Sequence, residues 1–245
     1  MIVETILRDR EAFFAEIRNR IGLSHKNLAM LMSSIIFLSM YGLVMGFSHG
    51  LLQAASSAIK LPFLFIVTLM ICTPSLHFFN LFFGSRQTLG QTMALVLTAM
   101  TTTSVILVSF SPVTFFFLTT TGEYMFFKLL NVAFFGIAGV MGIYFLRQGI
   151  RAMESGEEEV DILDEEDELK QKPSINTVKE DDGKQTRSLI FMVWVILYGF
   201  VGTQMAWTLR PFVGYPETEF VLFRQIGGNF YSDVFTSLGS LLGMP

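Results

Sequence analysis

The sequence lacks almost every residue pattern from which catalytic and metal sites are built. Its single cysteine, Cys72, excludes an internal disulfide and a multi-cysteine metal site. Its three histidines, His25, His49 and His77, have no metal-ligand spacing between any two of them. The chain also has no glycine-rich phosphate loop, no nucleophile elbow and no pair of acids within an apolar stretch. We therefore predict that the protein is not an enzyme and that it uses no metal and no cofactor.

Charged residues are scarce as well. They make up 16% of the 245 residues, whereas about a quarter of a soluble domain is charged. Hydrophobic residues reach 51%, and 26 of the residues are phenylalanine. A soluble chain of this size could not bury so much apolar surface, so we expect much of it to face a lipid bilayer. The basic residues are scattered at segment ends, and we predict no nucleic-acid partner.

Long apolar runs predict how often the chain crosses the membrane. A helix needs about 20 mainly apolar residues to cross the hydrocarbon core, where only helices and closed barrels satisfy the backbone. Five runs qualify, and they are continuous rather than alternating, which argues against a barrel. We predict an all-α integral membrane protein, a bundle of five transmembrane helices at residues 28–47, 61–83, 89–110, 124–146 and 189–209.

Two segments outside the predicted spans, residues 1–26 and 148–187, lie on the same side of the bundle and differ in composition. Residues 1–26 have apolar residues at near-helical spacing, which predicts an amphipathic helix that either packs on the bundle or lies on the membrane surface. Residues 148–187 link the four-span part, 27–147, to the fifth span, 188–209. Within this linker, 154–183 are so acidic that we expect disorder through much of the segment, with a short helix around 164–172. We interpret this acidic stretch either as a solvated loop or as an acidic docking strip for a basic partner.

The last segment, 210–245, is too apolar for a free tail. Arg210 and Pro211 end the fifth helix, since proline disfavours helix in the residue before it. Apolar residues at i, i+3 and i+4 from Asn229 onward predict a short helix. We infer an external cap that serves as a lid on the bundle, as an interaction surface or as a re-entrant segment. Its candidate contact residues are Arg210, Phe223, Arg224, Phe230 and Tyr231.

Polar residues within the spans are the remaining candidates for a functional site, because each is costly in lipid without a partner. Pro74, His77 and Asn80 are three residues apart and share a helix face. One hypothesis is a small transporter or channel whose path is lined by His77, Asn80, Thr101 and Gln204 of the second, third and fifth spans. The other is that these groups form helix–helix hydrogen bonds, each worth about 1 kcal/mol.

Two features of the fourth span predict contacts. Gly136, Gly139 and Gly142 would let a second helix approach closely, either within the chain or from another copy. Lys128, near the start of this span, is expected to extend its ammonium group to the outer interface.

The stretch IKLPFLFIVTLMICTPSLHFFNLFFGSRQTLGQTMAL, within residues 59–146, resembles the start of the bundle in Yip1-domain membrane proteins. The shared features are a beginning with lysine and proline, a long span, a short glycine-containing loop and a second span. The acidic linker and the outer cap depart from that pattern. The resemblance implies a membrane-organising or trafficking-adaptor role without catalytic residues.

A second stretch, GTQMAWTLRPFVG, is similar to uncharacterised bacterial polytopic proteins and implies a bacterial plasma membrane. We thus predict a scaffold, regulator or adaptor with a membrane-protein partner or a homo-oligomeric state.

The positions of lysine and arginine predict the orientation, because cytoplasmic flanks carry an excess of both. With the N-terminus inside, thirteen of the 17 basic residues fall on the cytoplasmic side and four on the outside. The outer four are Lys60, Lys128, Arg210 and Arg224. We predict a cytoplasmic N-terminus and an external C-terminus.

An epitope tag at the C-terminus is therefore expected to be labelled by antibody on intact cells, because it lies outside. A tag at the N-terminus is the control and should require permeabilisation. Labelling of the C-terminal tag only after permeabilisation would reverse the orientation.

Overall fold

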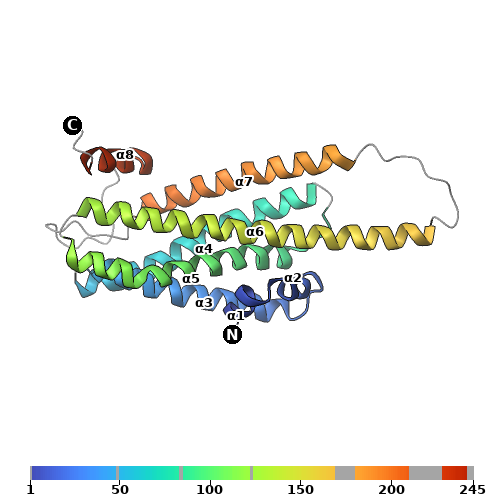
Figure 1. The fold of residues 1–245 in the computed structure, drawn as a ribbon, viewed down its shortest axis with the longest axis horizontal. Helices are drawn as coiled ribbons and strands as arrows, with labels where there is room; N and C mark the ends of the chain where they lie inside the picture. The colour runs from blue at the N-terminus through green and yellow to red at the C-terminus, as the bar shows by residue number, and fades with distance from the viewer. Residues whose placement is uncertain are drawn as a thin grey trace.

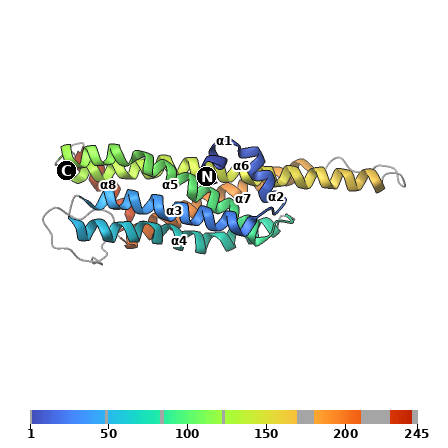
Figure 2. The same ribbon diagram turned by 90° about the horizontal axis from the view of Figure 1, so that it is seen from below.

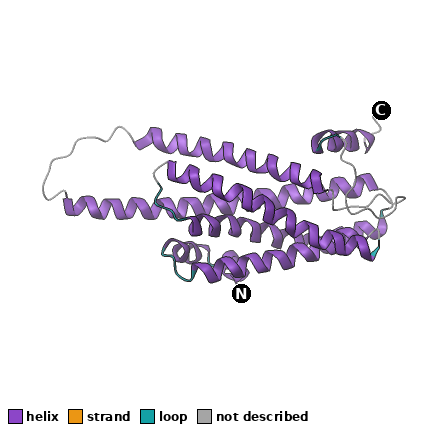
Figure 3. Ribbon diagram, turned by 180° about the vertical axis from the view of Figure 1, so that it is seen from behind, coloured by secondary structure: helices purple, strands orange, loops and turns teal. Residues whose placement is uncertain are grey.

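The computed structural model describes residues 2–47, 50–82, 85–121, 124–168, 180–209 and 228–241. These ranges contain helices and no strand (Figure 3). Five of the helices are long and apolar enough to cross a membrane, so the prediction of an all-α bundle is confirmed and the chain is a polytopic membrane protein. The helices are α1 Ile2–Arg8, α2 Arg10–Arg18, α3 Leu23–Gly46, α4 Leu51–Phe82, α5 Leu89–Thr120, α6 Tyr124–Glu168, α7 Glu180–Leu209 and α8 Phe230–Leu241.

The spanning helices are longer than the apolar runs that predicted them. Helices α4 and α5 each have 32 residues, which at 1.5 Å per residue is about 48 Å. This exceeds the hydrocarbon core of about 30 Å, so both helices tilt or extend past it. They continue through Pro62, Pro74 and Pro112. In a bundle, neighbouring helices and hydroxyl side chains satisfy the groups that a proline leaves unpaired.

Helix α6 is the longest element, at 45 residues. It continues past the ends of α3, α4 and α5 on the side where α1 and α2 lie (Figure 1). The prediction of disorder is wrong for residues 154–163, which belong to this helix, and for 180–183, which belong to α7, whereas 164–168 are helical as predicted. Glutamate and leucine are good helix formers, and extending an existing helix needs no new nucleus. The rest of the predicted short helix, from residue 169 onward, lies outside the described residues.

The spanning helices form a layered bundle. Helix α3 packs against α4 and α5, and α5 also packs against α6 (Figure 2). Helix α7 packs against α4. Glycines permit the tightest of these contacts. A Cβ atom at Gly42 would lie 2.6 Å from the carbonyl oxygen of Ser57, and one at Gly46 would lie 2.7 Å from the Cα atom of Ala54. The backbones of α3 and α4 therefore approach each other directly.

The N-terminal segment forms two helices where a single one is predicted. Asp9 separates them and caps α2 by accepting a hydrogen bond from the Ala12 N–H group at 3.4 Å. Phe13, Phe14 and Ile17 of α2 are buried against the bundle. Of the two interpretations of this segment, the structure therefore agrees with the one in which it packs on the bundle. We call this end of the bundle, which carries Arg10 and Arg147, the arginine-rich end, and the opposite one the α8 end.

A buried glutamine fixes α2 to the bundle. The Gln91 side chain, in the first turn of α5, donates hydrogen bonds to the carbonyls of Ile17 at 3.3 Å and Arg18 at 2.9 Å. These carbonyls lie in the last turn of α2, where a helix leaves its carbonyls without a partner four residues on; the Ile17 carbonyl also accepts from the Arg20 N–H group at 3.1 Å. Gly22 then begins α3 from a left-handed conformation, with φ of 61°, which glycine adopts without strain. The N-terminal pair is thus an integral part of the fold.

The three glycines of α6 differ in their surroundings. A Cβ atom at Gly142 would lie 2.3 Å from Thr103 Oγ1 and 3.0 Å from the Ala99 carbonyl oxygen of α5. At Gly136 and Gly139 it would meet no atom of the described residues within 4 Å. Only Gly142 therefore serves the close helix–helix contact that the sequence suggests for all three.

Substituting Gly142→Ala is expected to destabilise the bundle by about 1–3 kcal/mol, because the added methyl group forces α5 and α6 apart. Thermal unfolding in detergent measures this. Gly139→Ala is the matched control and should leave the unfolding temperature unchanged or raise it, since alanine favours helix over glycine. Equal effects of the two substitutions would contradict this packing.

Candidate functional site

The buried hydroxyl groups of α5 form a polar seam inside the bundle. Thr98, Thr101, Thr102 and Thr103 each donate a hydrogen bond to the carbonyl four residues earlier, at 2.7 to 2.9 Å. The Thr101 hydroxyl also lies 3.0 Å from Ser34 Oγ of α3. A predicted site residue, Thr101, is therefore part of the interface between α3 and α5.

His77 and Asn80 hold the end of α4 to the beginning of α5. His77 Nδ1 shares a hydrogen bond of 3.2 Å with Thr92 Oγ1. Asn80 Nδ2 donates to Gln87 Oε1 at 3.3 Å. The structure thus brings these two predicted residues into one region, at the arginine-rich end.

The other two predicted residues lie elsewhere. Thr101 is nine residues along α5 from Thr92, which corresponds to about 13 Å of helix. Gln204 is half-buried on α7, which packs against α4 and α8 rather than at the interface of Thr101. The four residues therefore belong to three separate contacts, and the path through them stays a prediction.

A tyrosine that the sequence analysis did not select is the centre of another polar contact. Tyr41 of α3 donates a hydrogen bond to Asn131 Oδ1 of α6 at 2.7 Å, and Asn131 Nδ2 donates to the Phe127 carbonyl at 2.8 Å. Both side chains are buried. The sequence contains enough information to select Tyr41, because a tyrosine in the middle of an apolar span needs a partner for its hydroxyl group.

Helix α8 is fixed to the beginning of α6 and the end of α7. Lys128 Nζ of α6 donates to Asp233 Oδ2 of α8 at 2.8 Å. On α7, the Thr203 hydroxyl shares a hydrogen bond of 3.1 Å with the Tyr231 hydroxyl, and Trp207 Nε1 donates to the Gly228 carbonyl at 3.0 Å. Lys128, which was expected to extend to the interface, is thus an anchor of the cap.

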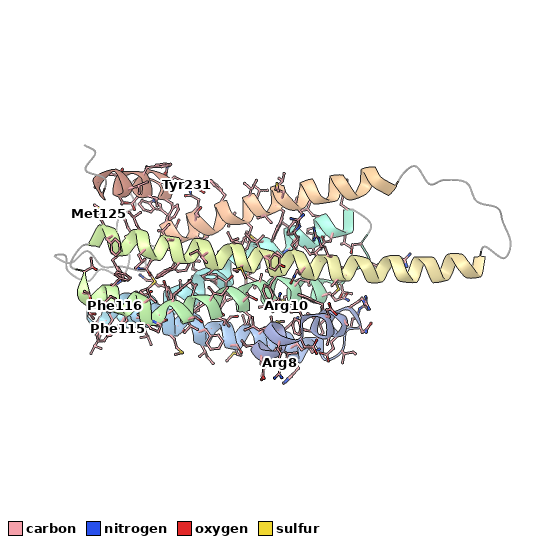
Figure 4. All side chains as sticks on the ribbon, viewed as in Figure 1. Arg8, Arg10, Phe115, Phe116, Met125 and Tyr231 are labelled. Carbon is pink, nitrogen blue, oxygen red and sulfur yellow. The ribbon has the colours of Figure 1, made fainter. Side chains whose placement is uncertain are left out.

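Three exposed apolar residues share one face of α8. Phe235 is 72% exposed, and Tyr231 and Leu238 are exposed at spacings that place all three on one face. Ser237 is only 2% exposed and lies toward the bundle, as does Asp233. Ser232, Thr236 and Ser240 are exposed as well, so the exposed side of α8 carries both apolar and hydroxyl side chains. Its apolar residues fit contact with lipid or with a partner protein. Figure 4 shows Tyr231 on α8, at the same end of the bundle as Met125 at the start of α6.

Of the predicted cap contacts, Phe230 and Tyr231 belong to α8, and Tyr231 also stacks on Phe200 of α7 with ring centres 6.3 Å apart. Arg210, Phe223 and Arg224 lie outside the described residues. Within the described ranges, no three His, Cys, Asp or Glu side chains are grouped so that they could hold a metal ion.

Comparison with protein-family models, curated proteins and solved structures finds no match to this chain. The likeness to Yip1-domain proteins therefore stays a prediction from the sequence.

Substituting Asp233→Asn keeps the shape of the side chain and removes its charge, so α8 should separate from α6 more often. A partly exposed ion pair contributes at most about 1 kcal/mol. We expect hydrogen–deuterium exchange in residues 228–241 to become up to about fivefold faster. Ser240→Ala is the control, because the Ser240 hydroxyl bonds only within α8. Unchanged exchange in the Asp233 variant would show that the ion pair does not hold the cap.

Proposed function

We propose that this protein is a non-enzymatic membrane scaffold or regulator that holds a basic partner through the end of α6. The observation that carries the proposal is the projection of α6 beyond the other spanning helices (Figure 1). We call residues 154–168 of this helix the acidic arm. With the N-terminus in the cytoplasm, the arm is cytoplasmic, and the bacterial plasma membrane inferred from the sequence is its setting.

The acidic arm is long and highly charged. Its fifteen residues correspond to about 22 Å of helix beyond Met153, the last buried residue of the described α6 side chains. Ten of the fifteen are aspartate or glutamate, and none is basic. Such a charge density attracts a partner of opposite charge and speeds its association. A basic surface on a cytoplasmic or membrane protein is the complementary partner.

The base of the arm is held in place by α2. The Arg10 guanidinium lies 4.8 Å from the centre of the Phe145 ring of α6. A Cβ atom at Gly149 would lie 2.6 Å from Leu95 Cδ2 and 2.8 Å from Phe14 Cε1, so α6 packs closely there against both α5 and α2. A firmly held base limits the directions that the arm can take. This favours presentation of a binding surface, since less ordering is needed when a partner binds.

The interior polar groups also support a scaffold over a transporter. His77, Asn80 and Thr101 each bond a neighbouring helix or the loop before it. Groups engaged in this way stabilise helix packing. The Yip1-like adaptor role inferred from the sequence agrees with the same proposal.

Cross-linking in cells followed by purification in mild detergent should recover a stoichiometric partner with a basic surface. We expect the variant Glu157→Gln/Glu158→Gln to lose most of it, because two charges are removed from the arm. The variant Glu4→Gln/Glu11→Gln removes the same charge from the N-terminal helices and should retain the partner.

Two results would contradict this function. The first is a partner-free monomer from wild-type cells. The second is equal loss of the partner in both variants, which would indicate a general dependence on net charge.

A further inference from the structure

We propose that an anionic phospholipid binds to α6 at the arginine-rich end of the bundle. Its headgroup lies between Arg10 of α2 and Arg147 of α6, and its acyl chain follows the exposed face of α6 toward the α8 end. This lipid site is independent of the partner proposed for the acidic arm, because it involves other residues and a different ligand.

The acyl chain would lie on a continuous apolar stripe. Ile137, Val140, Met141 and Tyr144 are all exposed, Val140 at 66% and Tyr144 at 50%. Their spacing of three or four residues places them on one side of the helix. Tyr144 is the last of these residues before the chain becomes basic, and an amphipathic aromatic ring suits the boundary between acyl chains and headgroups.

Cations follow at the end of this stripe. Arg147 and Arg151 are exposed and lie three and seven residues beyond Tyr144. The Gln148 amide nitrogen donates a hydrogen bond to the Tyr144 hydroxyl at 3.0 Å. The sequence of groups along one side of α6 is therefore apolar, then polar, then cationic, which matches a phospholipid from chain to headgroup.

The third cation comes from a distant part of the sequence. Arg10 lies over the Phe145 ring, and Figure 4 shows it nearer the bundle than Arg8. At about 100° per residue, Phe145 and Arg147 flank the side of α6 that carries Tyr144 and Arg151. Arg10 and Arg147 thus lie on either side of the stripe. Stacking on a ring leaves the edge N–H groups of a guanidinium available to phosphate oxygens.

Charge complementarity identifies the ligand class. Two or three arginines at the end of an apolar stripe favour a negative headgroup over a zwitterionic one, and basic pockets at helix ends are known to bind anionic lipid headgroups. A soluble phosphate compound would use the arginines but not the stripe, so the lipid should bind more tightly.

Native mass spectrometry of the purified full chain tests this proposal with phosphatidylglycerol and phosphatidylcholine of identical acyl chains. We expect the wild type to retain phosphatidylglycerol preferentially. Each arginine near an anionic lipid contributes about 1 kcal/mol, or about fivefold in affinity. The variant Arg10→Gln/Arg147→Gln should therefore bind phosphatidylglycerol about thirtyfold more weakly, and Arg10→Lys/Arg147→Lys should keep most of the preference.

The matched control is Arg8→Gln/Arg20→Gln, which removes the same charge from the same end of the bundle. Arg8 pairs with Glu4 at 3.5 Å and its side chain is 83% exposed, and Arg20 lies in the turn after α2. This control should retain the lipid. Equal binding of the two lipids by the wild type, or equal loss in both glutamine variants, would overturn the proposal. Displacement of the lipid by glycerol phosphate at equal concentration would overturn it too. Unchanged thermal unfolding of the Arg10 and Arg147 variants separates lost binding from lost folding.

Discussion

The absence of water from the membrane interior is the constraint on which this structure depends. Each polar group within a span must find its partner in the protein, because leaving it unpaired in hydrocarbon costs several kcal/mol. The hydroxyls of Thr98, Thr101 and Thr102 in α5 meet this requirement locally, by bonding the preceding turn of their own helix. Groups that cannot do so reach across to a neighbour, as Tyr41 does to Asn131. The contacts that satisfy these polar atoms therefore also hold neighbouring helices together.

Much of the fold follows from the sequence because the number of spans depends only on local composition. The positions of the helix ends do not follow from local composition. Residues 51–60, with several serines and alanines and one lysine, fall below the apolar threshold, yet α4 begins at Leu51. The acidic stretch after Met153 has the composition of a disordered linker, yet α6 continues through it. In both places a helix established nearby extends into residues that would not begin one.

The candidate site was less predictable, since its contacts join residues far apart in the chain. Lys128 and Asp233 are 105 residues apart, and the pair depends on how α8 returns to α6. Nothing local distinguishes Gly142, which contacts α5, from Gly139, which does not. The polar residues on α4 could be recognised as sharing a face, but their partners on α5 depend on the geometry of the connection between the helices. Sequence patterns identify groups that need partners; the packing of the helices determines which partners they have.

The continuity of α6 has a mechanical consequence. One uninterrupted rod connects Lys128, beneath α8, with Glu168 at the far tip. Because the helix is continuous, a displacement of its tip is transmitted along α6 to the opposite side of the bilayer. Between these two points, Phe14 and Leu95 pack closely against α6 at Gly149. A force on the tip of α6 is therefore transmitted along the helix to the end that contacts α8.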